Sequence, residues 1–168
     1  MITEPKLENR HEQHYVAIRT QVTMQELDTT IQYLRREVLA WIAHQGIAPT
    51  GAPFLRNRVI DMEALLDIEV GIPVVSVESP DDRVRAGVLP AGLYASLVYT
   101  EWDRGIEANA ALLDWGAKQG LVWDAWETEK GQAFGARLMS LLTDPNEEPD
   151  QAKWETEVAI RLADPQPR

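Results

Sequence analysis

The sequence predicts an α+β fold made of two copies of one strand–helix–strand–strand (βαββ) unit, and two internal echoes support this. Residues 39–47 (LAWIAHQGI) are echoed by residues 113–121 (LDWGAKQGL), and residues 69–74 (EVGIPV) by residues 157–162 (EVAIRL). A helix end and a later strand therefore recur in the same order. We expect one domain over residues 1–168, with a first half at about 10–78 and a second at about 82–163.

The first half begins after a short leader at residues 1–10, with a strand predicted by apolar alternation at residues 14–20. Thr23 and Glu26 have the spacing of a capping box, which marks the start of a helix. Gly46 is placed to end that helix. Two strands are expected at residues 54–62 and 65–75. The apolar stripe of the helix consists of Leu27, Ile31, Leu34, Val38 and Trp41.

The second half follows a turn at residues 79–82 and repeats the pattern. Strands are expected at residues 84–89 and 93–100, and Asp103 is a candidate N-cap for the second helix. Its apolar stripe is expected to be Ile106, Ala110, Leu113 and Ala117. A tryptophan-rich connection at residues 123–134 then leads to strands at residues 137–142 and 154–163.

Each helix stripe is apolar on one side only, so both helices should cover one face of an antiparallel sheet. The halves would then be related by a pseudo-twofold axis. No third layer is available for the other face of the sheet. That face must then be polar, be paired with itself or form a cleft. Of these, a ligand cleft between the two halves is the one that we expect.

Composition excludes several classes of function. The net charge of −11 argues against direct nucleic-acid binding, which needs a basic patch. The absence of cysteine removes disulfides, thiol catalysis and thiolate metal sites. No apolar run approaches the length of a membrane span, and a cytoplasmic location is expected. His11, His14 and His44 do not have the arrangement of a metal site, so neither a metal nor another cofactor is expected.

Eight short stretches form an ordered set that spans nearly the whole chain: residues 5–8 (PKLE), 39–41 (LAW), 60–62 (IDM), 70–74 (VGIPV), 89–95 (LPAGLYA), 112–115 (LLDW), 143–145 (TDP) and 154–158 (WETEV). No single stretch is specific, but in their order and spacing they resemble the GyrI-like family of small-molecule (effector) binding domains. These domains occur in multidrug-responsive bacterial regulators and as stand-alone proteins. The resemblance implies a pseudo-symmetric pair of strand–helix–strand–strand units with a ligand cleft between them.

Glu157 is the leading candidate for a binding residue. In the last predicted strand, Thr156 and Val158 point to one face and Glu157 to the other, because strand side chains alternate. If the aliphatic residues face the helices, Glu157 faces the open side. The resemblance implies the same, since family members place a glutamate here on the floor of the drug pocket. Glu69 occupies the corresponding place in the first half.

The aromatic walls of the predicted cleft come from the second half. Tyr94 and Tyr99 should face opposite sides of one strand. Trp102 is expected at the mouth of the cleft, and Trp123 and Trp126 on a lid. Trp41 and Trp115 belong to the two helices and are expected in the core. The full set of predicted ligand-binding residues is Glu157, Glu69, Tyr94, Trp102, Trp123, Trp126 and Trp154.

These residues favour binding of small lipophilic, cationic aromatic molecules, because a carboxylate among aromatic rings attracts cations. Such a protein senses or sequesters its ligand. Two alternatives remain. The first is a hydrolase of reactive cyclopropane-bearing compounds, as the resemblance implies for some relatives, with Glu157 and Tyr94 as catalytic candidates. Leu141 replaces a tyrosine that is common in the family, which weakens that alternative. The second is an interaction or inhibitor module with a protein partner.

Overall fold

A computed structural model describes residues 1–61, 63–76 and 81–164 of the chain. The strands of the first half are β1 (Lys6–Arg10), β2 (Gln13–Val22), β3 (Phe54–Ile60) and β4 (Leu66–Pro73), with helix α1 (Leu27–His44) between β2 and β3. The strands of the second half are β5 (Arg85–Leu89), β6 (Gly92–Thr100), β7 (Ala125–Thr128), β8 (Gly131–Phe134), β9 (Arg137–Leu141) and β10 (Glu155–Arg161). The short 3-10 helix η1 (Trp102–Arg104) and helix α2 (Gly105–Lys118) follow β6. A second 3-10 helix, η2 (Gln151–Lys153), precedes β10.

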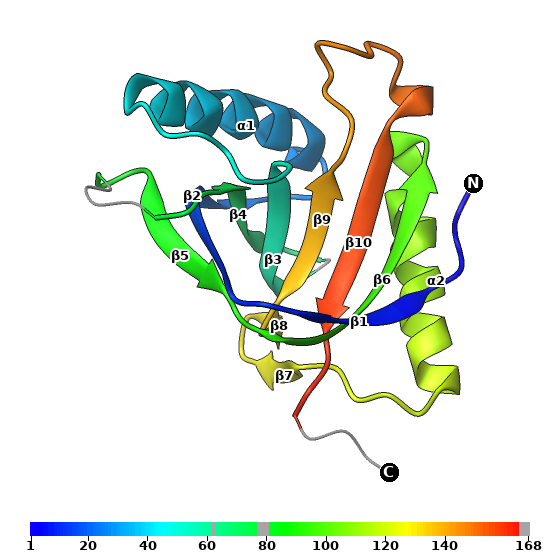
Figure 1. Cartoon of the computed structure of the whole chain (residues 1–168). Coiled ribbons are helices and arrows are strands. Elements are labelled where there is room, and N and C mark those ends of the chain that lie inside the picture. The colour runs from blue at the N-terminus through cyan, green and yellow to red at the C-terminus, as the bar shows by residue number, and fades with distance from the viewer. Residues whose placement is uncertain (62, 77–80, 165–168) are drawn as a thin grey trace.

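The sheet shows the duplication directly. In the first half β2 pairs with β4 and β4 with β3, and in the second half β6 pairs with β10 and β10 with β9, all antiparallel. The halves join where β3 pairs with β9 (Figure 1). The sequence therefore correctly predicted an α+β fold with two equivalent units, and the β3–β9 pair is the seam between them.

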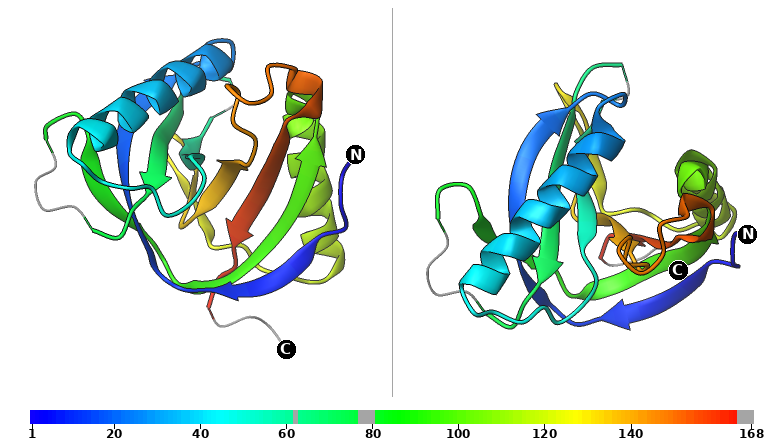
Figure 2. Two further views of the ribbon diagram at one scale, coloured as in Figure 1. Left: turned by 45° about the horizontal axis from the view of Figure 1, so that its top comes forward. Right: turned by 90° about the horizontal axis from the view of Figure 1, so that it is seen from above.

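The first and second halves are also joined at their outer strands. β1 runs into β2 and β5 runs into β6, and the β1–β6 and β2–β5 ladders continue one register, from Lys6 opposite Ser96 to Ala17 opposite Arg85. This long ribbon curls the sheet (Figure 2). The predicted leader at residues 1–10 was therefore wrong in part, because five of these residues form β1 and pair with β6.

Both helices cover the same face of the sheet, here called the helix face. Helix α1 packs on β2 and β4 through Ile31, Leu34 and Val38, as its stripe predicted, and also through Ile42, which the predicted stripe did not contain. Helix α2 packs on β6 and β10. Trp41 and Trp115 are partly buried against these cores. Among the described residues, no helix has the length and apolar character needed to cross a membrane.

The opposite face, here called the far face, is buried by the curl of the sheet itself. Tyr15 from β2, Phe54 from β3 and Tyr94 from β6 meet in one buried cluster, although β2 and β6 lie toward opposite ends of the strand order. Tyr15 and Phe54 contact edge to face with ring centroids 5.1 Å apart. No helix is needed to cover this face, because curvature brings its side chains together.

Helix α2 differs from the sequence prediction in its start and in its buried side. It begins at Gly105 after η1, so Asp103 is not its N-cap. Its buried residues are Ala108, Leu112 and Gly116 instead of the stripe that begins at Ile106. The ring of Trp123 takes the space beside Gly116, where an added Cβ would collide with it. A glycine therefore admits the indole that closes the core here.

Local details of the remaining elements follow the predicted outline. Thr23 and Glu26 form the reciprocal bonds of a capping box, in the turn just before α1 begins. The tryptophan-rich connection contains the β7–β8 hairpin, which pairs with the end of β3. Of the predicted turn at residues 79–82, residues 79 and 80 lie outside the described residues. Asp81 accepts bonds from the backbone N–H groups of Arg83 and Val84.

Candidate functional site: a pocket between the two helices

A pocket of about 480 Å³ opens on the helix face, above the seam between the halves. Its walls come from the first turns of α1 and from the N-terminal part of α2, which stand apart on this face in Figure 2. Its floor comes from β3, β4 and β9. The helices contribute Leu27, Asp28, Ile31, Ile106, Asn109, Ala110 and Leu113, and the strands contribute Leu55, Asn57, Ile60, Leu66, Arg137 and Met139; Met24, Trp102, Asp103 and Gly105 complete the lining.

The apolar stripe of α2 is the main apolar wall of this pocket. Ile106, Ala110 and Leu113 were expected in the core, but all three line the pocket, and Ile106 is 70% exposed. The helix is therefore apolar on two sides, one packed on the sheet and one open to the pocket. An exposed isoleucine in a concave apolar lining is typical of a surface that binds something.

Three polar side chains lie together in this apolar lining. The pairing of Arg56 with Leu138 places Asn57 and Arg137 next to each other across the seam. Arg137 donates from Nη2 to Oδ1 of Asn109 on α2, at 3.0 Å. Asn109 in turn donates from Nδ2 to the carbonyl oxygen of Gly105, at 2.8 Å. Asn109 is thereby fixed, and it orients the guanidinium of Arg137 from above.

Arg137 lacks an anionic partner among the described residues. Its guanidinium lies over the ring of Phe134, 4.8 Å from the centroid, and its buried Nε has no hydrogen-bond partner. Desolvation lowers the pKa of Arg137 to about 10, because burial disfavours the charged form. The group is still protonated at neutral pH. The pocket floor therefore carries one positive charge.

Trp102 is the one predicted ligand-binding residue in the lining of this pocket. Glu101, just before it, has a φ of 77°, which is unusual for a residue other than glycine. The Glu101 N–H donates to the carbonyl oxygen of Trp154, at 3.1 Å, and Trp102 packs edge to face on the Trp154 ring, with centroids 6.3 Å apart. This turn holds Trp102 at the base of α2, while Trp154 lies in the core beneath it.

Glu157 lies on the far face and outside the pocket. The phase of β10 is as predicted, because Val158 and Ile160 pack beneath α2 while Glu157 points away. Its Oε1 accepts from Nη2 of Arg10, at 2.9 Å. The cleft was predicted on the far face, whereas this pocket is on the helix face. The curl of the sheet fills the far face with its own side chains, and the diverging helices leave the space.

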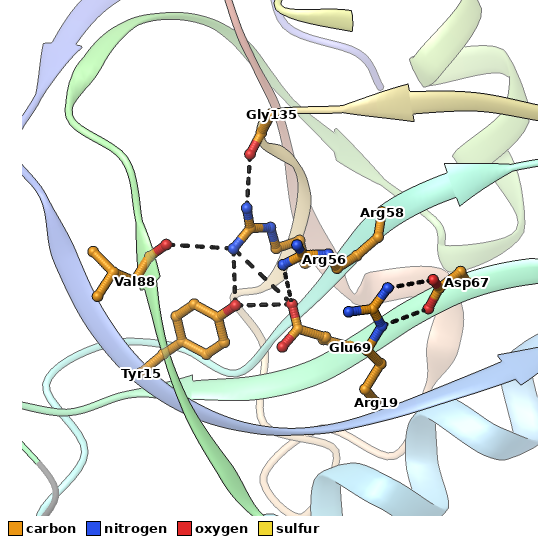
Figure 3. A network of polar contacts seen from close by, with 8 residues as sticks. All are labelled: Tyr15, Arg19, Arg56, Arg58, Asp67, Glu69, Val88 and Gly135. Atoms are coloured by element: carbon orange, nitrogen blue, oxygen red, sulfur yellow. Dashed lines mark hydrogen bonds and ion pairs between the residues drawn. The ribbon is translucent and has the colours of Figure 1, made fainter. Parts of the chain in front are cut away.

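Glu69 also lies on the far face, within a buried polar network (Figure 3). Its Oε1 accepts from the Tyr15 hydroxyl at 2.8 Å and from Nη1 of Arg58 at 2.9 Å. Arg56 adds bonds to the Tyr15 hydroxyl at 2.8 Å and to the carbonyl oxygen of Gly135 at 2.7 Å. Burial, reinforced by the Glu69 charge, raises the pKa of Tyr15 to about 12. The network joins β2, β3 and β4 to the second half.

The remaining predicted residues lie apart from one another. Tyr94 and Tyr99 face opposite sides of β6, as predicted, and the Tyr94 hydroxyl donates to the carbonyl oxygen of Pro90, at 2.7 Å. Trp123 packs against the α2 core and is not a lid. Trp126 is 53% exposed on β7 and outside the pocket lining.

Sequence reasoning missed Asn57, Asn109 and Arg137. Arg137 offered one signal, since it is the one charged residue of the predicted strand at residues 137–142 and, two residues before Met139, faces the same side as that residue. Asn57 and Asn109 lie far apart in sequence, and only the pairing of β3 with β9 brings the first of them to Arg137. Within the described residues, no group of three or more His, Asp or Glu side chains is placed to hold a metal ion.

Comparison with known proteins agrees with this architecture. A model of the GyrI-like small molecule binding domain matches residues 3–163. The chain therefore belongs to the GyrI-like family. A search of curated protein sequences gave no significant match.

Solved structures show the same fold at low identity. The EcmrR C-terminal domain is 16% identical, with a TM-score of 0.74 over 95% of this chain and 97% of that one. EcmrR in complex with DNA gives a TM-score of 0.77 at 16% identity; the match covers 95% of this chain but only 57% of that longer chain. SAV2435 bound to tetraphenylphosphonium is 12% identical, with a TM-score of 0.64 over 96% of this chain and 95% of that one. A hydrolase from Listeria innocua is 11% identical, with a TM-score of 0.60 over 95% of this chain and 92% of that one.

Proposed function

We propose that this protein binds small lipophilic molecules in the pocket between α1 and α2. The observation that carries the proposal is the second apolar side of α2, where Ile106, Ala110 and Leu113 line the pocket. Family membership supports a small-molecule ligand, and SAV2435, which shares the fold, is bound to tetraphenylphosphonium.

Apolar contact would supply most of the affinity. A ligand that buries roughly 300 Å² of apolar surface gains about 7 kcal/mol at about 25 cal/mol per Å², before the costs of association. The pocket volume of about 480 Å³ suits a molecule of two to four fused or linked rings. Binding, without turnover, is the activity that this lining supports best.

The predicted preference for cations would have to come from Asp28 and Asp103, which are the carboxylates of the lining. Both side chains are exposed. Exposed ion pairs contribute about 0–1 kcal/mol, because water and salt screen them. Attraction of cations to this pocket would therefore be weak, and the size and shape of the apolar body would dominate selection.

A bulky residue in the wall of the pocket should weaken binding strongly. Ala110→Trp places an indole in the lining at an exposed position of α2, so we expect the affinity for the neutral dye Nile red to fall by about tenfold or more. Fluorescence titration measures the change. Ala117→Trp is the matched control, since Ala117 is exposed on the same helix but outside the lining. Equal affinity in both variants would place the ligand elsewhere.

Glu157→Gln should leave binding in this pocket unchanged, because Glu157 lies on the far face and is paired with Arg10. We expect dissociation constants for Nile red and for tetraphenylphosphonium within about twofold of the parent protein. Isothermal titration calorimetry gives both values. A selective loss of tetraphenylphosphonium binding would instead make Glu157 the charge-selecting residue, as the sequence suggested.

The hydrolase alternative has less support. It needs a tyrosine hydroxyl beside the Glu157 carboxylate, yet the Tyr94 hydroxyl donates to Pro90 and Glu157 accepts from Arg10. The Tyr94 hydroxyl and the Glu157 carboxylate are therefore hydrogen-bonded to other groups and not to each other. The likeness to the Listeria innocua hydrolase extends to the fold alone at 11% identity.

A further inference from the structure

The pocket floor contains a positive charge that the described protein does not neutralise. Arg137 forms no ion pair within the described residues, and its one side-chain hydrogen bond there goes to the neutral amide of Asn109. Its Nε is buried without a partner. A partly buried charge without a counter-ion has lost hydration that nothing replaces, and an anionic ligand would offset this cost.

Arg137 and Asn57 have hydrogen-bond donors that are available for a ligand. Arg137 has five N–H donors, and Asn109 takes one of them. Within the described residues Nη1 of Arg137 has no partner, and the side chain of Asn57, 7% exposed in the same lining, forms no hydrogen bond there. Asn109 accepts from Arg137 and donates to Gly105, so it positions the guanidinium. The planar fork of arginine matches the two oxygens of a carboxylate.

We propose that the ligands of this pocket are lipophilic organic acids, whose apolar body contacts α1 and α2 and whose carboxylate binds Arg137 beside Asn57. The inference rests on the proposed function and adds the chemical class of the ligand. The sequence suggested a cationic ligand, because it pointed to Glu157. The pocket contains Arg137 instead of Glu157, so the ligand proposed here is an anion.

Two acidic residues of the lining oppose this selection. Asp28 and Asp103 would repel an acid, but both are exposed, so their effect is screened. Arg137 is partly buried, and desolvation lowers its pKa. Electrostatic interactions are stronger in such a site than at the surface. The charge at the floor therefore outweighs those at the rim.

The test uses three naphthalenes that differ in one substituent at the same ring position: a carboxylate, a hydroxymethyl group or an aminomethyl group. Isothermal titration calorimetry at neutral pH compares the parent protein with Arg137→Gln, which removes the charge and keeps a shorter, polar side chain. Arg104→Gln is the matched control, since it removes an equal charge from an exposed residue beside the pocket but outside the lining.

We expect the parent protein and Arg104→Gln to bind the acid about 10- to 100-fold more tightly than the alcohol, and the amine least tightly. In Arg137→Gln the acid and the alcohol should bind alike, with the affinity for the alcohol nearly unchanged. The inference is overturned if the parent protein does not prefer the acid, or if Arg137→Gln keeps that preference. If Ala110→Trp leaves the affinity for the alcohol unaltered, the proposed pocket itself is wrong, and this inference fails with it.

Discussion

Glu69→Ala is expected to lower the free energy of unfolding by about 3–5 kcal/mol, because it removes the anion from a buried network and leaves two arginines without it. Glu69 accepts from the Tyr15 hydroxyl and from Arg58, and lies 4.0 Å from Nη1 of Arg56. Arg56 is 7% exposed, so water cannot solvate its guanidinium when Glu69 is removed. Chemical denaturation, followed by tryptophan fluorescence, measures the loss.

The control lies two residues away on the same strand. Asp67 binds Arg19 through two hydrogen bonds of 2.9 and 2.6 Å, but the Arg19 side chain is 54% exposed. Asp67→Ala should therefore cost about 0.2–1 kcal/mol, the range for exposed ion pairs. Similar losses in the free energy of unfolding for Glu69→Ala and Asp67→Ala would mean that burial does not determine how much the Glu69 network stabilises the fold. Figure 3 shows both ion pairs side by side.

Local patterns predicted the elements well because helices and strands depend on neighbouring residues. The strand phase at Glu157 and the capping box at Thr23 and Glu26 both appear as expected. The second helix shows the limit of such patterns. Its sequence is apolar on two sides, and periodicity does not say which side meets the sheet. Gly116 and Trp123 decide this, through a contact that only the folded chain creates.

The candidate site was harder to predict because it depends on how the sheet curls. Glu157 was correctly turned away from the helices, but that face is filled by Tyr15, Phe54 and Tyr94. The curl arises from the continuous ribbon of β1–β2 with β5–β6, in which residues 6–10 take part. Those residues looked like a leader in the sequence. Once the far face is filled, the space between the helices becomes the site.

Trp102→Ala is expected to combine a large loss of stability with a loss of binding. Trp102 is 8% exposed, packs in the α1 core and contacts the Trp154 ring, so its truncation should cost about 3–5 kcal/mol. It also lines the pocket, and the cavity left behind would enlarge the site and reduce its contacts with a ligand. We therefore expect Nile red to bind at least about tenfold more weakly, measured below the unfolding transition.

Trp126→Ala is the matched control, since both tryptophans were predicted as ligand contacts. Trp126 is 53% exposed on β7 and lies outside the lining, so its truncation should change stability by about 0.5 kcal/mol or less and leave Nile red binding intact. Denaturation curves and fluorescence titrations of the two variants compare them directly. If Trp126→Ala weakens binding while Trp102→Ala does not, the ligand contacts the β7–β8 hairpin and the pocket between the helices is not the site.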